Sequence, residues 1–210
     1  MGGCCMKERS RSKDSAVLAA QTHFSVTEVE SLYELYRRLS SSIVDDGFIS
    51  REEFQVGLFR DRREQSIFTD RMFNQFDSKH DGMIDFEEFV QGLSIFHPNA
   101  PQTEKATFTF QLYDIWETGY IEPEEVRVMI LAFLDESDLV LSDDIIQGII
   151  DKTFEEADSK GDGKIDLEEW EGFVARTPSI LKNMTIPYLK DITTAFPSFV
   201  QRNDTDEKIY

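Results

Sequence analysis

Cysteine and histidine are scarce in this sequence of 210 residues. The two cysteines, Cys4 and Cys5, are adjacent at the N-terminus, which excludes a disulfide framework and a cysteine-based zinc site and indicates a reducing compartment. The three histidines, His23, His80 and His97, form no cluster. Because no Ser/His/Asp or Cys/His constellation can be drawn from these residues, we do not expect an enzyme.

Long apolar runs and positive charge are also in short supply. No stretch approaches the roughly 18 apolar residues needed to cross a bilayer, and the start of the chain lacks the hydrophobic segment of a secretory signal. The 41 Asp and Glu against 22 Lys and Arg give a net charge of −19, which repels phosphate backbones and excludes nucleic acid as a partner. Hydrophobic residues still make up 40% of the chain, with 17 Phe, so we expect a folded protein whose body lies in the cytosol.

An acidic repeat of 12 residues organises the chain. Residues 77–88 and 158–169 both place acidic residues at repeat positions 1, 5, 9 and 12, glycine at 6 and isoleucine at 8. A hard divalent cation requires oxygen ligands: the glycine allows the loop to turn, the carbonyl at position 7 ligates, and the final Glu ligates with both oxygens. The pattern therefore predicts two calcium-binding helix–loop–helix units, or EF-hands. Their predicted ligands are Asp77, Asp81, Met83 (backbone), Asp85 and Glu88, and Asp158, Asp162, Lys164 (backbone), Asp166 and Glu169.

Two further copies of the repeat are degraded. Residues 114–125 carry Trp116 at position 3 and Thr118 at position 5, so we expect this loop to bind calcium weakly or to stay empty. Its candidate ligands are Asp114, Thr118, Tyr120 (backbone) and Glu125. The earliest copy ends at Glu53 and has no carboxylate at its start. It is either an expanded calcium loop that begins near Ser40 or a purely structural loop.

Lysine occupies position 3 of both complete loops, as Lys79 and Lys160. An ammonium group donates hydrogen bonds and cannot ligate a cation, so water would have to supply the missing ligand. We therefore expect affinities in the range of calcium sensors rather than of calcium buffers.

Hydrophobic periodicity predicts helices on both sides of each loop, and hence an all-α fold of two lobes, each a pair of EF-hands, with a C-terminal helical tail. Ser25 and Glu28 have the spacing of a capping box, Ser142 suits the cap of a later helix, and Pro123 suits a first helical turn. A proline-flanked stretch, residues 97–102, separates the lobes. The predicted parts are a lipidated or disordered leader (1–23), an N-terminal pair of hands (24–97), a C-terminal pair (103–176) and an apolar tail (177–210).

Both ends of the chain carry features of their own. The tail is too apolar for a solvated terminus, and is either a lid that a partner displaces or a permanent part of the C-terminal lobe. At the other end, Gly2, Cys4 and Cys5 predict a lipid anchor of myristate and palmitate, although Met6 departs from the Ser or Thr that the myristoylation pattern prefers. The expected location is the cytoplasmic face of the plasma membrane, with part of the protein in the cytosol. A disordered leader with incidental cysteines is the alternative.

From Phe24 to Val200 the sequence resembles the calcineurin B-like calcium sensors of plants. The resemblance rests on the irregular first loop from Ser40 to Gly47, on Tyr113–Asp114 and Thr118–Gly119 in the third loop, on Gly163–Asp166 and Glu169–Trp170 in the fourth, and on the closing Phe-Pro-Ser-Phe segment, residues 196–199.

The resemblance implies a non-catalytic sensor that binds the regulatory segment of a serine/threonine kinase, relieves its autoinhibition and carries it to a membrane to act on ion transporters. It also implies that the kinase phosphorylates Ser198, and that the first loop can hold calcium through main-chain oxygens. A regulatory chain of a calcium-dependent phosphatase, similar to calcineurin B, is the alternative function, and a simple calcium buffer is a third.

Overall fold

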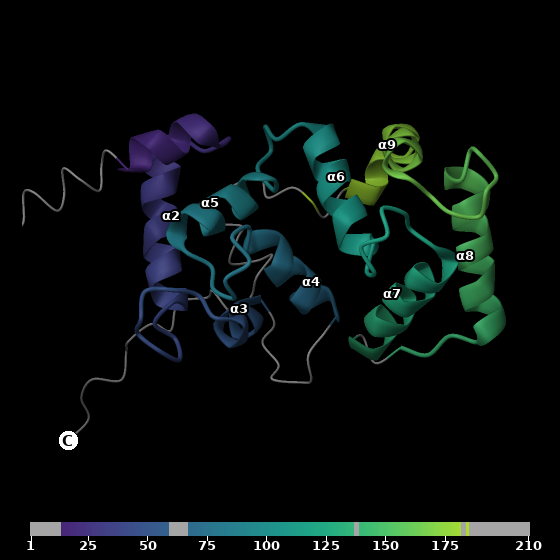
Figure 1. Ribbon diagram of the computed structural model, residues 1–210, viewed down its shortest axis with the longest axis horizontal. Coiled ribbons are helices and arrows are strands. Elements are labelled where there is room, and N and C mark those ends of the chain that lie inside the picture. Colours follow the sequence, from purple (N-terminus) through teal and green to yellow (C-terminus); the bar gives the residue numbers. More distant parts are fainter. Residues whose placement is uncertain (1–13, 59–66, 137–138, 182–183, 185–210) are drawn as a thin grey trace, which may run out of the picture.

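Helices joined by loops make up the protein, whose computed structural model describes residues 14–58, 67–136, 139–181 and 184 (Figure 1). The fold is all-α, as predicted. The helices are α2 (Val26–Leu39), α3 (Arg51–Leu58), α4 (Ile67–Phe76), α5 (Phe86–Ser94), α6 (Gln102–Tyr113), α7 (Pro123–Glu136), α8 (Asp143–Ala157) and α9 (Leu167–Arg176), followed by the 3-10 helix η1 (Pro178–Leu181). Among the described helices, none is both long enough and apolar enough to cross a bilayer.

The helix ends follow local sequence signals. Ser25 caps α2 with the predicted capping box, in which its hydroxyl accepts from the Glu28 N–H while the Glu28 carboxylate accepts from the Ser25 N–H. Pro123 is the first residue of α7, where its missing N–H costs nothing. Ser142 does precede α8, but its side chain makes no capping hydrogen bond.

The leader predicted over residues 1–23 does not extend that far. Residues 14–21 are helical, and Leu18, 6% exposed, packs into the main core together with Phe24. The reason is local, because this segment contains Ala16, Ala19 and Ala20, and alanine has the highest helix propensity. Gly2, Cys4 and Cys5 lie outside the described residues.

One hydrophobic core joins the two predicted lobes. In Figure 1, α2 to α5 occupy one half of the molecule and α6 to α9 the other, and α4 packs against α6 between them. The rings of Phe96 and Phe108, on either side of the proline-flanked stretch, meet edge-on with centroids 5.5 Å apart. The start of the tail belongs to the same core, since Leu181 and Met184 are buried in it. The halves are therefore docked, and residues 185–210 lie outside the described part of the chain.

Candidate calcium-binding loops

The four loops are paired by short antiparallel bridges. Ile49 and Ile84 exchange two backbone hydrogen bonds of 2.9 Å, and Ile121 and Ile165 exchange bonds of 2.8 and 2.9 Å. All four isoleucines are at most 1% exposed, so each pair of hands shares a dry contact at loop position 8. The Tyr36 hydroxyl reinforces the first pair by donating to the carbonyls of Gly47 and Ile84, and burial raises its pKa, which keeps it a neutral donor.

The glutamate at position 12 is buried in every loop. Glu53, Glu88, Glu125 and Glu169 are 0 to 4% exposed. A buried carboxylate needs hydrogen bonds, and backbone N–H groups of the same loop supply them. In the second loop the Glu88 carboxylate accepts from the N–H groups of Lys79 and Asp85, at 2.9 and 3.0 Å. Each loop thus holds its last carboxylate in place against the loop backbone.

Positions 9 and 12 also start the helix that follows the loop. Asp85 is the N-cap of α5 and forms a capping box with Glu88, and Asp166 does the same for α9 with Glu169. The residues that are predicted to ligate calcium therefore also satisfy the free N–H groups of a helix N-terminus. This double role explains why the loop and its exiting helix fold as one unit.

The aspartate at position 1 folds the first half of each standard loop. In the second loop the Asp77 carboxylate accepts from the N–H groups of Asp81 and Gly82 at 3.1 and 2.9 Å. In the third loop Asp114 accepts from Thr118 and Gly119 at 2.8 and 2.9 Å. The third loop therefore has the same turn as the second, although its side chains at positions 3 and 5 depart from the pattern. Gly82, Gly119 and Gly163 all have φ between 81° and 84°, which favours glycine at position 6.

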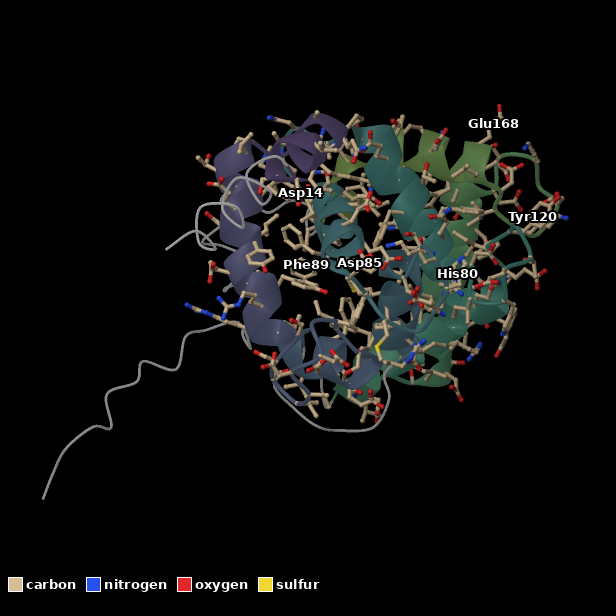
Figure 2. All side chains as sticks on the ribbon, turned by 60° about the vertical axis from the view of Figure 1, so that its left-hand side comes forward. Asp14, His80, Asp85, Phe89, Tyr120 and Glu168 are labelled. Carbon is tan, nitrogen blue, oxygen red and sulfur yellow. The ribbon has the colours of Figure 1, made fainter. Side chains whose placement is uncertain are left out.

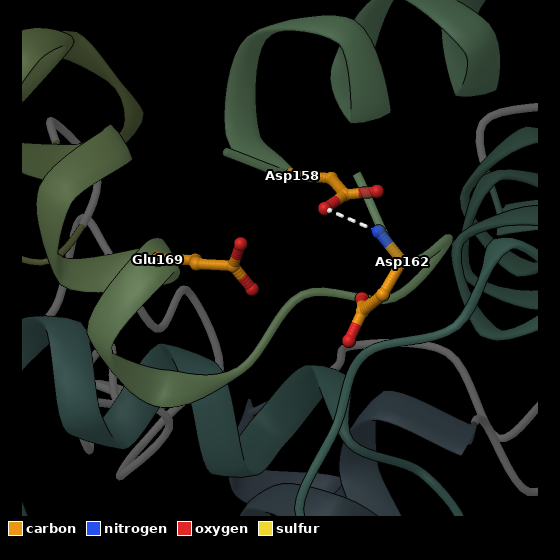
Figure 3. Close-up of side chains that lie close together, drawn as sticks. All are labelled: Asp158, Asp162 and Glu169. Carbon is orange, nitrogen blue, oxygen red and sulfur yellow. Dashed lines mark hydrogen bonds between the residues drawn. The ribbon is translucent and has the colours of Figure 1, made fainter. Parts of the chain in front are cut away.

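The fourth loop brings three carboxylates closest together. Oxygens of Asp158, Asp162 and Glu169 lie within 4.8 Å of one another, and the Glu169 carboxylate faces the other two (Figure 3). Hard carboxylate oxygens at this spacing are the ligands that calcium prefers, so the residues fit the ion. A bound calcium ion would supply the positive charge that offsets the mutual repulsion of these three carboxylates.

Lysine at position 3 lies against the ligand at position 9. The Lys79 ammonium donates to the Asp85 carboxylate and lies 3.8 Å from Glu88 Oε2. In the fourth loop Lys160 donates to Asp166 in the same way. Burial alone would raise the pKa of Asp85, but the Glu88 N–H and the Lys79 ammonium outweigh it and hold that pKa below its usual value. The sequence shows that these lysines cannot ligate calcium, but it does not indicate that they pair with the carboxylate at position 9.

The first loop matches the others only in its second half. Glu53 accepts from the N–H groups of Ile43 and Val44 at 3.1 and 3.2 Å, and Asp46 accepts from the Phe48 N–H at 2.9 Å. Ser40 is buried at the end of α2, where its N–H donates to the Tyr36 carbonyl. No carboxylate takes the place that Asp77 has in the second loop. Both predicted alternatives for this loop, calcium binding through backbone oxygens or a structural role, stay open.

The third and fourth loops lie side by side. The Lys164 ammonium sits 3.6 Å from the centroid of the Tyr120 ring, a cation–π contact between the two position-7 residues. Figure 2 shows Tyr120 and Glu168 on the same side of the molecule. The backbone carbonyls of Tyr120 and Lys164, the predicted ligands, thus belong to neighbouring loops.

Comparison with known proteins identifies this arrangement. Residues 103–175 match the EF-hand domain pair family, and residues 68–96 match the EF hand domain family. Calcineurin B-like protein 5 of Arabidopsis thaliana is 52% identical over 203 residues, which are 96% of this chain and 100% of that protein. The chain belongs to the calcineurin B-like family. This confirms the resemblance seen in the sequence.

The calcineurin B-like chain also has relatives among the calcineurin B proteins. The calcineurin B chain of Yarrowia lipolytica is 34% identical over 165 residues, 79% of this chain and 90% of that protein. The calcineurin B chain of Naegleria gruberi is 34% identical over 149 residues, 71% of this chain and 80% of that protein. With its EF-hands and this family membership, the chain binds calcium and is a calcium sensor of the calcineurin B-like type, as predicted.

Proposed function

We propose that this sensor binds an amphipathic helix in the regulatory segment of a serine/threonine protein kinase, activates the kinase and recruits it to a membrane to regulate ion transport. We infer that it acts on its partner and has no catalytic activity of its own. The observation that carries the proposal is a set of exposed apolar side chains on and between α7 and α8. They are Leu131, Phe133, Leu139, Val140, Leu141, Ile145 and Ile149.

These side chains suit an amphipathic helix. Phe133 and Ile145 are more than half exposed, and Ile145 and Ile149 are four residues apart on α8, so they share a face. Apolar surface of this kind is typical of grooves that bind the apolar face of a partner helix. The net charge of −19 of the whole chain favours a partner helix whose polar face is basic.

Calcium-dependent binding of a kinase regulatory peptide tests this proposal. The double variant Ile145→Asp/Ile149→Asp should weaken binding at least tenfold, because two buried apolar contacts are lost. The matched control is Val17→Asp/Val26→Asp, which alters two comparably exposed apolar residues outside the calcium loops and away from α7 and α8, and should leave binding within about twofold. Equal affinity of both double variants would contradict the proposed surface.

We propose the calcium ligands as follows. The second loop uses Asp77, Asp81, Asp85, Glu88 and the Met83 carbonyl, and the fourth uses Asp158, Asp162, Asp166, Glu169 and the Lys164 carbonyl. The third loop uses Asp114, Thr118, Glu125 and the Tyr120 carbonyl with lower affinity, and residues from Ser40 to Glu53 form the irregular first site. The buried, backbone-bonded glutamate at the end of each loop supports these assignments.

The tail is proposed as a lid that the partner displaces. At its start, Ile180, Leu181 and Met184 pack in the core, so a deletion should begin after Met184. Removal of residues 185–210 should tighten binding of an isolated kinase peptide, because the lid no longer competes for the groove. Weaker binding would mean that the tail forms part of the binding site.

Phosphorylation of Ser198 is proposed to strengthen the complex, since a phosphate adds nearly two negative charges and three acceptor oxygens. Ser198 lies outside the described residues, and the proposal rests on the Phe-Pro-Ser-Phe sequence around it. Mass spectrometry after incubation with the active partner kinase and ATP should find Ser198 modified. An unmodified serine at high kinase turnover would remove the claim.

A lipid anchor at the N-terminus is proposed to place the sensor at the cytoplasmic face of the plasma membrane. A single myristate binds membranes only marginally, whereas a second acyl chain or a basic cluster makes attachment stable. Gly2 can take myristate, and Cys4 and Cys5 can take palmitate. A basic cluster follows them, made of Lys7, Arg9, Arg11 and Lys13. Fractionation should find the wild type in the membrane and Gly2→Ala and Cys4→Ser/Cys5→Ser in the soluble fraction. A wild type as soluble as both variants would exclude the anchor.

A second candidate function is supported by the calcineurin B relatives, whose names describe one of the chains of calcineurin. In that case the apolar surface on α7 and α8 would hold a helix of a calcium-dependent phosphatase. Purification of the protein with its bound partners from its own cells separates the two functions, because the captured catalytic chain is either a kinase or a phosphatase.

A further inference from the structure

Arg71 in α4 reaches out of the second hand and into the third. Its Nη2 donates to the carbonyls of Gln111 and Asp114 at 2.6 and 2.7 Å, and its Nη1 donates to Glu117 Oε1 at 2.8 Å. The residue is only 8% exposed, and its Nε is buried without a hydrogen-bond partner among the described residues. Burial of this guanidinium is therefore costly, and the three contacts with the third hand offset that cost.

The first two contacts lie where helix α6 ends and the third loop begins. Gln111 lies in the last turn of α6, where carbonyls lack helical partners, and the Ile115 N–H donates to the Tyr113 carbonyl instead. Asp114 is position 1 of the loop. The guanidinium thus fixes the backbone where α6 ends and Asp114, the first predicted ligand of the loop, begins.

The third contact holds a residue in an unfavourable backbone conformation. Glu117 is position 4 of the third loop and has φ of 55°, in the left-handed region that residues with a Cβ rarely adopt. The same position has φ of 55° at His80 in the second loop and 70° at Gly161 in the fourth. The third loop therefore has the usual backbone at position 4, and the ion pair with Arg71 anchors the side chain at this position to α4.

We propose that Arg71 is a positioning residue for calcium binding by the third hand: from the helix that enters the second hand, it holds residues 114–117 in the shape that ligates the ion. The inference rests on the proposed occupancy of the third loop. It explains how the loop with degraded positions 3 and 5 keeps the same turn as the second loop.

The two tryptophans allow the third and fourth hands to be followed separately in the intact protein. Trp116 is position 3 of the third loop and is half exposed, whereas Trp170 follows Glu169, the last ligand of the fourth loop. In protein labelled with 5-fluorotryptophan, fluorine NMR gives one resonance for each, and Trp116→Phe assigns them. A calcium titration then yields one midpoint for each hand.

Arg71→Met should raise the calcium midpoint of the Trp116 resonance about tenfold, because hydrogen bonds from a charged group are lost, while the Trp170 midpoint changes less than about twofold. Arg71→Lys, which keeps the charge but not the fork of donors, should give an intermediate shift. Arg37→Met is the charge-matched control: Arg37 lies in α2, outside the loops, and pairs with Glu34, so its loss should leave both midpoints within about twofold.

Several outcomes separate the claims. A wild-type Trp116 resonance that ignores calcium means that the third hand is empty, which overturns the proposed occupancy and this inference with it. A wild-type response that Arg71→Met leaves unchanged, or equal shifts of both resonances, overturns the inference alone. If Arg71→Met does not fold, Glu117→Gln takes its place. It should shift the Trp116 midpoint more than Glu124→Gln, which removes the same charge from an exposed residue at position 11 of the same loop. Equal shifts in these two variants would also overturn it.

Discussion

Gly92 in α5 packs directly against the ring of Phe76 in α4: a Cβ on Gly92 would meet Cδ1 of that ring at 2.5 Å. Phe76 is 3% exposed and is the last residue before the second calcium loop, so it cannot move without disturbing the core or the loop. The contact allows the two helices of the second hand to approach closely.

Gly92→Ala should therefore lower the free energy of unfolding by about 1–3 kcal/mol, because the added methyl group overpacks the core. Chemical denaturation in the presence of a calcium chelator measures this without the contribution of the ion. Gly148→Ala is the matched control, since Gly148 lies within α8 and a Cβ there has no neighbour within 4 Å. It should stabilise the protein by about 0.5–1 kcal/mol, and equal destabilisation by both variants would contradict the packing argument.

Removal of the last carboxylate from the second and fourth loops should weaken calcium binding by both loops. In Glu88→Gln/Glu169→Gln, each loop loses an anionic ligand that would bind with both oxygens, so calorimetry should show that both hands lose affinity by about tenfold or more. The control is Glu87→Gln/Glu168→Gln, which removes the same charge from exposed neighbours at position 11. Unchanged binding by Glu88→Gln/Glu169→Gln would mean that the first and third hands carry the ions.

The loops could be predicted because their chemistry is local. Asp77 to Glu88 places every ligand, the turn glycine and the helix cap within one short segment, so the sequence order alone fixes their roles. The same holds for the capping box of Ser25 and for Pro123 at the start of α7, both of which the structure confirms. The ligand assignments themselves stay predictions.

Contacts between distant segments could not be predicted in the same way. Arg71 and Glu117 are 46 residues apart, and no local period indicates that their helix and loop meet. The pairing of Phe96 with Phe108 depends in the same way on how the two halves dock. Sequence patterns showed two lobes, whereas the shared core that joins them is a property of their packing.

The lysines at position 3 should weaken calcium binding by the second and fourth hands. The Lys79 and Lys160 ammonium groups already pair with Asp85 and Asp166, and a calcium ion must displace them from these carboxylates. Such partly exposed ion pairs contribute little, so Lys79→Met/Lys160→Met should tighten binding by at most about fivefold at each hand. Methionine is a suitable replacement because its soft sulfur is not a calcium ligand.

Calorimetry at low salt measures this effect, and the gain should shrink as salt is added, because ions screen exposed pairs. The matched control is Lys152→Met, which removes the same charge from an exposed lysine of α8 that pairs with Glu156, outside the loops. Long-range attraction of calcium to the more negative protein would affect both variants, so only the difference between them reports on displacement. Lys79→Met/Lys160→Met removes two charges and Lys152→Met removes one. If the double variant gains no more affinity than twice the gain of the control, on a free-energy scale, the ammonium groups do not compete with the ion.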